Sequence, residues 1–244
     1  MVLVRAGLQH ERLVGLRARL ALPDVDGDDV GAALAREGHV AGEFEGDPTA
    51  EDRGVLERLR LFPRHPEDAE LGETLREQRR LGRIPASLAG RTVALLFEKP
   101  SLRTRVTFDV GIKLLGGHPV YLSPEEVGIG HRETATDVGR NLSRWVDGIV
   151  FRTFGHDTLV ELASVASVPV VNALSDHEHP CQALADMLTL RQHLGSLRGK
   201  ALAYVGDGNN VCHSLLLAGS LAGLELRVAT PPGYEPDPAG DPRG

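Results

Sequence analysis

From about residue 71 onward, the chain has a regular pattern in which short apolar runs alternate with segments of helical periodicity. Thr92–Phe97 reads TVALLF between a glycine and a proline, as expected of a buried strand. Val106, Val110 and Leu114 then recur at intervals of four, which predicts an apolar stripe on a helix capped by a serine. Such alternation is typical of βαβ units, in which helices cover both faces of a parallel sheet.

The same pattern continues to about residue 230 and predicts an α/β fold with two doubly wound parallel-sheet domains, the second incomplete. Further strands are expected at 119–122, 148–152, 168–172, 200–206 and 225–230, and further helices at 134–145, 157–166, 182–194 and 211–222. We predict a domain at 63–192 with four strands, and one at 193–244 with two. Two strands and one helix are too few for an independently stable α/β domain.

Residues 1–62 form an atypical N-terminal segment with little apolar periodicity, although 10–22 and 52–61 could be helical. The acidic run at 24–29 lacks the glycine and the closing glutamate of a calcium loop, so a solvated linker is predicted. The whole chain is 41% hydrophobic and 25% charged, which favours a packed core over disorder.

Charge and cysteine content narrow the function classes. The chain has 27 Lys and Arg against 34 Asp and Glu, a net charge of -7, which disfavours general binding to nucleic acid or to a membrane surface. No apolar run approaches the ~20 residues of a membrane span, and no signal peptide is recognisable, so a cytoplasmic location is expected. Cys181 and Cys212 cannot form a disulfide framework and lack metal-ligand spacing.

Ser101, Arg103 and Thr104 follow the first predicted strand, where a helix begins. Doubly wound sheets bind ligands at the carboxyl ends of their strands, and a helix N-terminus attracts anions. The two hydroxyls add donors, and the guanidinium adds a bidentate fork. These residues fit a phosphate, with an ordinary capped helix carrying exposed arginines as the alternative.

Two more strand ends carry polar residues. Arg152 ends an otherwise apolar strand, which suits contact with the same phosphate or with a carbonyl oxygen, or an ion pair with an acidic residue. His179 precedes Pro180 at the start of a helix, which directs His179 and Gln182 to the same sheet edge. Adjacent residues in the run 177–179 point apart and have no third ligand at useful spacing, so no metal site is predicted.

The turn after the fifth predicted strand resembles the start of a dinucleotide-binding unit. However, only Gly206 and Gly208 are present, Val211 occupies the third glycine position, and no acidic residue ends the next strand. A nicotinamide-dependent enzyme is therefore disfavoured. The side-chain amides of Asn209 and Asn210 suit a zwitterionic ligand such as an amino acid.

Four motifs in order carry a family resemblance: 97–105 (FEKPSLRTR), 151–154 (FRTF), 179–182 (HPCQ) and 206–210 (GDGNN). Over about residues 81–238 the chain resembles the aspartate/ornithine carbamoyltransferase family. Lys99 and the 206–210 turn favour the ornithine branch over the aspartate branch.

The resemblance implies transfer of the carbamoyl group from carbamoyl phosphate to the neutral δ-amine of ornithine, which gives citrulline and phosphate in arginine metabolism. It assigns phosphate binding to Ser101, Leu102 through its backbone, Arg103 and Thr104. Arg152 would bridge the phosphate and the carbonyl oxygen. Family members need no metal or organic cofactor and form trimers with active sites at subunit interfaces.

The resemblance assigns the rest of the chemistry to three residues. His179 would donate to the carbonyl oxygen, Gln182 would hold the carbamoyl amide, and Asn210 would orient the α-amino and carboxylate groups of ornithine. Arg103, Arg152 and His179 would then act by electrostatic catalysis, without a covalent intermediate.

Several features depart from the family pattern. Leu102 occupies a position that is usually Thr, and Gly128 one where many members have a Gln that reaches the neighbouring subunit. The later ornithine-binding and carbamoyl-pocket segments have no counterpart, so the chain is expected to be truncated. Two alternatives follow: a non-catalytic remnant that binds carbamoyl phosphate, and a related transcarbamoylase that acts on another amine, such as putrescine or an acetylated ornithine.

Overall fold

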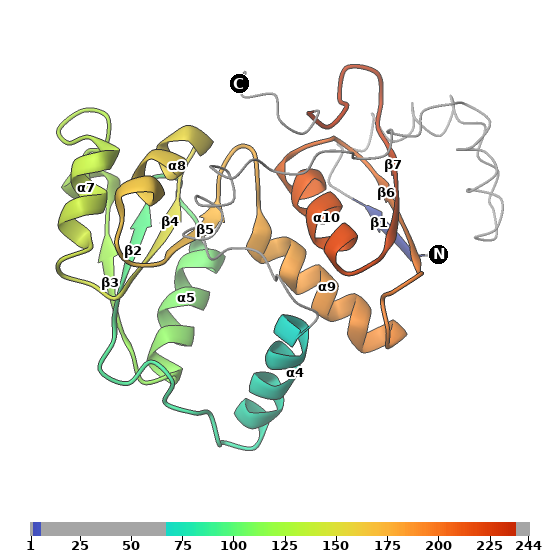
Figure 1. Ribbon diagram of the computed structural model, residues 1–244, viewed down its shortest axis with the longest axis horizontal. Helices are drawn as coiled ribbons and strands as arrows, with labels where there is room; N and C mark the ends of the chain where they lie inside the picture. Colours follow the sequence, from blue (N-terminus) through green and yellow to red (C-terminus); the bar gives the residue numbers. More distant parts are fainter. Residues whose placement is uncertain (1, 6–66, 238–244) are drawn as a thin grey trace.

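The computed structural model describes residues 2–5 and 67–237 as two parallel β-sheets with helices packed against them (Figure 1). The first sheet has the order β3-β2-β4-β5. Its strands are β2 (Thr92–Phe97), β3 (His118–Leu122), β4 (Gly148–Arg152) and β5 (Val170–Leu174). All of its pairings are parallel, which confirms the expected α/β class.

Helices cover both faces of the first sheet. On one face, α7 (Ala135–Leu142) and α8 (His156–Val165) pack on alternate residues of β2 and β4, including Leu96 and Phe151. On the other face, α5 (Leu102–Leu114) packs on the intervening residues, including Leu95. This division follows from the period-two alternation of side chains along a strand.

The strand predicted at 168–172 begins and ends two residues later than expected. Pro169 carries no N–H to donate, so the ladder with β4 starts at the pair Ile149–Val170. The carbonyl of Pro169 accepts a 2.9 Å hydrogen bond from the Ile149 N–H just before that pair. The shift places Asn172 inside the strand and Leu174 at its carboxyl end.

The apolar stripe expected on α5 faces outward. Val106 is 48% exposed, and Val110 and Leu114 are similarly open. Phe108 and Ile112, four residues apart on another face, pack on the sheet instead. The helix carries two apolar rows, and spacing alone could not indicate which one the sheet covers.

The spacing of Val138, Leu142 and Trp145 predicts that all three lie on the inner face of the helix at 134–145, but Trp145 is 70% exposed. The reason is that α7 ends at Leu142, so Trp145 lies in the turn beyond it. Val138 and Leu142 are buried as expected. Thr134 and Asp137 have the spacing of a helix cap, and Thr134 caps α7 by accepting a 3.0 Å hydrogen bond from the Asp137 N–H.

The second sheet has three described strands in the order β1-β6-β7: β1 (Val2–Arg5), β6 (Ala201–Val205) and β7 (Glu225–Ala229). The sequence predicted only the last two. The parallel pairing of β1 with β6 joins the N-terminal strand to a sheet almost 200 residues away in the chain. The other expectations for 6–62 lie outside the described residues.

The helix α9 (Pro180–Leu194) belongs to both halves of the molecule (Figure 1). It contacts β5, while its Ala183, Met187 and Leu190 share a core with β6 and with α10 (Asn210–Leu221). The helix α4 (Glu67–Arg80) packs against its outer side, where Arg191 and Glu73 form a 3.6 Å ion pair. A short α6 (Pro124–Val127) follows β3.

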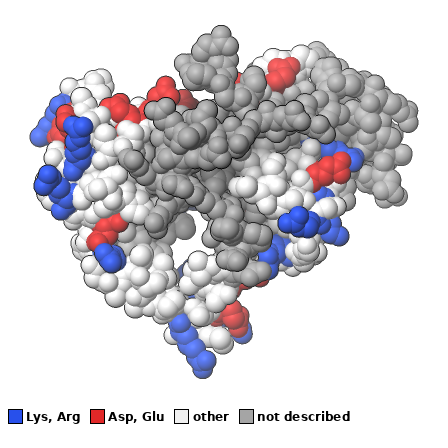
Figure 2. Space-filling view, viewed as in Figure 1, with Lys and Arg blue, Asp and Glu red and all other residues white. Residues whose placement is uncertain are grey.

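Two surface properties bear on the function classes considered above. On the face shown in Figure 2, acidic and basic side chains are interspersed over the described parts of both halves. Within the described ranges, no helix combines the length and the apolar character needed to cross a membrane.

Candidate active site

The N-terminus of α5 begins the candidate site, at the carboxyl end of β2. Ser101 is the N-cap residue, and its Oγ accepts a 3.3 Å hydrogen bond from the Thr104 N–H. The two hydroxyls are themselves 3.0 Å apart, with Ser101 donating. Leu102 is 78% exposed, and the side chain of Arg103 is also exposed. The first turn of α5 therefore presents its N–H groups and two hydroxyls beside an open guanidinium.

Arg152 ends β4 as a buried cation. The residue is only 9% exposed, and its Nε donates a 3.3 Å hydrogen bond to the backbone carbonyl of Lys99. Within residues 67–237, no carboxylate forms an ion pair with it. Burial accordingly lowers the pKa of Arg152 from its ordinary value. A buried guanidinium with spare donors is suited to an anionic ligand.

Contacts between the ends of β2 and β4 fix the position of Arg152. The Glu98 N–H donates a 2.8 Å hydrogen bond to the Arg152 carbonyl, and the Thr153 hydroxyl donates to the Glu98 carboxylate. The Lys99 ammonium lies 5.2 Å from the centre of the Phe154 ring. Glu98 and Thr153 were missing from the predicted site. The available signal was that each directly follows a predicted strand, in the FEKP and FRTF segments.

His179 is the N-cap residue of α9, and the positive charge of Arg152 acts on its imidazole ring. Its N–H donates a 2.8 Å hydrogen bond to the Ser214 hydroxyl, which belongs to α10. Its Nδ1 is buried and has no hydrogen-bond partner among the described residues. Burial, assisted by the positive charge of Arg152, lowers the pKa of His179 to about 4. The imidazole is therefore neutral at pH 7.

Asn210 begins α10 and reaches across to the loop that carries His179. Its Nδ2 donates a 2.7 Å hydrogen bond to the Ser175 carbonyl. The Ser175 hydroxyl accepts a 3.1 Å bond from the Glu178 N–H and lies 2.8 Å from His156 Nδ1. Asn210 thus anchors this loop through its Nδ2, and its amide oxygen remains available to a ligand.

Gln182 lies on the first turn of α9, but its side chain is exposed and donates a 3.0 Å hydrogen bond to Asp186. The structure therefore places Arg152 within electrostatic range of His179, joins Ser101 with Thr104 by a hydrogen bond, and links Asn210 to the loop that carries His179. Gln182 is directed along its own helix instead.

The segment after β7 folds over the start of α10. The Gly208 N–H donates a 2.8 Å hydrogen bond to the Tyr234 carbonyl. A Cβ at Gly208 would overlap backbone atoms of Glu235 and Pro236, so this approach requires glycine. The second glycine of the GDGNN motif therefore serves close backbone packing here.

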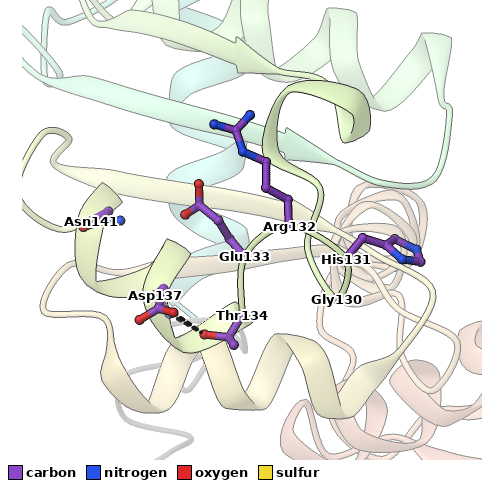
Figure 3. Close-up of a pocket in the computed structure, with 7 residues that line it drawn as sticks. All are labelled: Gly130, His131, Arg132, Glu133, Thr134, Asp137 and Asn141. Carbon is purple, nitrogen blue, oxygen red and sulfur yellow. Dashed lines mark hydrogen bonds between the residues drawn. The ribbon is translucent and has the colours of Figure 1, made fainter.

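A separate open pocket of about 530 Å³ lies between the 128–134 loop and α7 (Figure 3). Its lining includes Glu133, Thr134 and Asp137. Gly128 begins this loop with φ 63° and ψ 42°, and its carbonyl accepts a 2.7 Å hydrogen bond from the Arg132 N–H. Glycine fits this left-handed turn. Gly128 therefore provides no side chain at the position where many family members have a glutamine.

Comparison with protein-family models shows to which family this chain belongs. Residues 67–192 match the model described as aspartate/ornithine carbamoyltransferase, carbamoyl-P binding domain, and 198–240 match the corresponding Asp/Orn binding domain. The chain belongs to the aspartate/ornithine carbamoyltransferase family. The likeness that the motifs indicated is thereby confirmed.

Several relatives of this chain are named for ornithine. Proteins named ornithine carbamoyltransferase from Parafrankia sp. and from Thermus thermophilus are each 57% identical over 169 residues. These alignments cover 68% and 69% of this chain but 53% and 55% of the relatives. The chain thus spans about half the length of the curated relatives it matches.

Solved structures agree with the fold. The ornithine carbamoyltransferase from Thermus thermophilus has a TM-score of 0.64 at 56% identity, covering 71% of this chain and 61% of that one. The enzyme from Pyrococcus furiosus has a TM-score of 0.66 at 43% identity, covering 76% and 56%. The catalytic subunit of the M. jannaschii aspartate transcarbamoylase reaches 0.61 at 27% identity, covering 76% and 59%.

Proposed function

We propose that this protein acts as an ornithine carbamoyltransferase, which joins the carbamoyl group of carbamoyl phosphate to the δ-amine of ornithine and releases phosphate. The observation that carries the proposal is Arg152, a buried cation that has no carboxylate partner among the described residues. It ends β4 directly beside the turn that leads into α5. A phosphate there would supply the missing negative charge.

The residues proposed for the phosphate are Ser101, Arg103 and Thr104, with the Leu102 N–H and with Arg152. Helix N–H groups and the α5 dipole favour an anion at this point. The exposed Arg103 side chain is free to turn toward a bound ligand. Two guanidiniums would then neutralise the charge that moves onto phosphate as the carbamoyl bond breaks.

His179 would act on the carbonyl oxygen of the carbamoyl group. Because its pKa is lowered to about 4, it is a neutral hydrogen-bond donor at physiological pH rather than an acid. Arg152, close enough to influence that pKa, would share the same oxygen. The attacking amine must be uncharged, so the rate should rise with pH until the δ-amine is deprotonated.

Asn210 is proposed to orient the amino-acid part of ornithine, and Gln182 to hold the carbamoyl amide after turning from Asp186. The Asn210 amide oxygen stays available, because only its Nδ2 is committed to Ser175. Relatives named for ornithine support this amine over putrescine or an acetylated ornithine.

We also propose a carbamoyl-phosphate domain at 63–192 and an ornithine domain at 193–244, preceded by an atypical segment at 1–62. The two family-model matches support this division. A cytoplasmic homotrimer working in arginine biosynthesis remains a prediction from the resemblance. The outward apolar row on α5 offers a surface on which subunits could associate.

Calorimetric titration of carbamoyl phosphate into the full chain tests the proposed phosphate site. Saturable binding is expected in the wild type and in Lys113→Ala, which removes a cation from the far end of the same helix. Arg103→Ala should weaken binding at least tenfold, because the phosphate loses its bidentate partner. Equal affinity in all three proteins would reject the assignment.

A further inference from the structure

Three potential metal ligands from distant parts of the chain meet beside the start of α10. They are His177 from the loop before α9, His213 from α10, and Asp237 from the segment after β7. The ligand atoms that these side chains offer all lie within 4.8 Å of one another. No local spacing in the sequence indicates this group, because its members are separated by 36 and 24 residues.

The hydrogen bonds of His213 show which of its two ring nitrogens is unprotonated. The Asp237 N–H lies 3.0 Å from His213 Nε2 and donates to it, so Nε2 carries a lone pair. The proton of the neutral ring is therefore on Nδ1, which donates a 2.8 Å bond to the His177 carbonyl. Metal-binding histidines characteristically donate their second N–H to a backbone carbonyl in this way.

His177 is held in place by ring contacts on both sides. Its ring centre lies 4.7 Å from that of His213 and 5.2 Å from that of His156. The side chain is half-buried, whereas Asp237 is exposed. The group therefore combines two positioned imidazoles with one carboxylate that is open to solvent, which gives a metal ion a route of entry.

We propose that His177, His213 and Asp237 bind a divalent transition-metal ion of the Zn²⁺ class. Two imidazoles and a carboxylate suit such ions better than Ca²⁺ or Mg²⁺, which prefer oxygen ligands. Three protein ligands leave a fourth tetrahedral position for water. The proposal is independent of carbamoyl transfer, for which the family resemblance implies no metal.

Binding requires a modest contraction of the group. Ligands at about 2.0–2.1 Å from a tetrahedral ion are roughly 3.4 Å apart, so the widest separation would close by about 1.4 Å. Asp237 can supply this movement by turning its carboxylate toward His213 in place of its N–H. The ion would then fasten the segment after β7 to α10 and to the loop that carries His179.

Titration of the metal-free full chain with Co²⁺, followed by visible absorption, tests the site. We expect one equivalent to produce the intense d–d bands of a tetrahedral ion. His177→Ala and Asp237→Asn should each weaken that binding at least tenfold, while His193→Ala, a change of an exposed histidine on α9, should leave it unchanged. Asp237→Asn keeps the shape of an exposed side chain, so its loss of binding would not reflect misfolding.

Competition by Zn²⁺ should abolish the Co²⁺ bands at one equivalent. The proposal is overturned if the wild type gives no tetrahedral bands, or if both His177→Ala and Asp237→Asn bind Co²⁺ as tightly as the wild type. Neither result concerns carbamoyl phosphate, so a failure here leaves the proposed enzymatic function untouched.

Discussion

Asn210 and Ser175 are joined by a 2.7 Å hydrogen bond from the side-chain amide of one to the backbone carbonyl of the other. The bond links the start of α10, beside the second sheet, to the loop that follows β5 of the first. The His179 N–H makes a parallel link to Ser214 on α10. These two hydrogen bonds therefore connect residues proposed for the two substrates across the two halves of the molecule.

Asn210→Ala should weaken both the connection and amino-acid binding. The buried Ser175 carbonyl would lose its partner, at a cost of about 1 kcal/mol in the free energy of unfolding measured with urea. Calorimetry should show weaker binding of ornithine, with carbamoyl phosphate affinity changed much less. Asn141→Ala, at an exposed position on α7, is the control for both measurements. Equal losses for the two ligands would argue against this division of roles.

Gly208→Ala should destabilise the fold because the added Cβ would overlap the backbone of Glu235 and Pro236. Displacing that segment is expected to cost about 1–3 kcal/mol, measured by urea unfolding. Gly111→Ala is the matched control: its Cβ meets nothing within 4 Å inside α5, so a gain of about 0.5–1 kcal/mol is expected. Similar effects of the two changes would contradict the close packing over Gly208.

Glu178 should make the fold less stable as pH rises toward neutrality. Burial raises its pKa from 4.5 to about 7, so the folded chain keeps a proton that the unfolded chain releases. Its stabilising contribution is complete below pH 4.5 and is lost as pH rises through 7. Glu178→Gln, which stays uncharged, should remove this decline when unfolding is followed across that range. A variant that kept the wild-type slope would show that Glu178 is not the group responsible.

His179 should have the opposite pH dependence. Its pKa is lowered from 6.5 to about 4, so the unfolded chain binds a proton that the folded chain excludes. The contribution is present above pH 6.5 and is lost as pH falls through 4. His179→Gln should therefore flatten the loss of stability on the acid side, in the same unfolding series. A steeper acid loss in that variant would mean that the charged imidazole stabilises the fold.

Both cysteines should resist alkylation in the native protein. Burial raises the pKa of Cys181 to about 11 and that of Cys212 to about 12, so little thiolate exists at pH 8. Mass spectrometry after iodoacetamide treatment should find both sites almost unmodified, and both should react after unfolding in guanidinium. Fast native labelling of Cys212 would contradict its burial in the core that α10 shares with β6.

The sequence predicted most of the first sheet because its strands are short, apolar and bounded by turn residues. Thr92–Phe97 and Gly148–Arg152 have the predicted bounds. The predicted orientation of α5 was wrong. Its two apolar rows satisfy the same helical period, and only packing on the sheet determines that the row with Phe108 and Ile112 faces inward. The strand Val2–Arg5 was missed because its partner lies almost 200 residues away.

The candidate site was predictable to the extent that it depends on position at strand ends. The rule that parallel strands end at one edge predicted that Arg152 and His179 lie near each other, and the charge of Arg152 adds to the effect of burial in lowering the pKa of His179. The bond from Asn210 to Ser175 and the grouping of His177 with His213 could not be predicted. They depend on how the two sheets meet, which no local spacing encodes.

Citrulline formation by the purified full chain, supplied with carbamoyl phosphate and ornithine, tests the central claim most directly. We predict turnover in the wild type and in Lys113→Ala, with losses of at least a hundredfold in Arg103→Ala and in Arg152→Met. A folded wild-type chain that binds carbamoyl phosphate but forms no citrulline would contradict the proposed activity and favour a binding role alone.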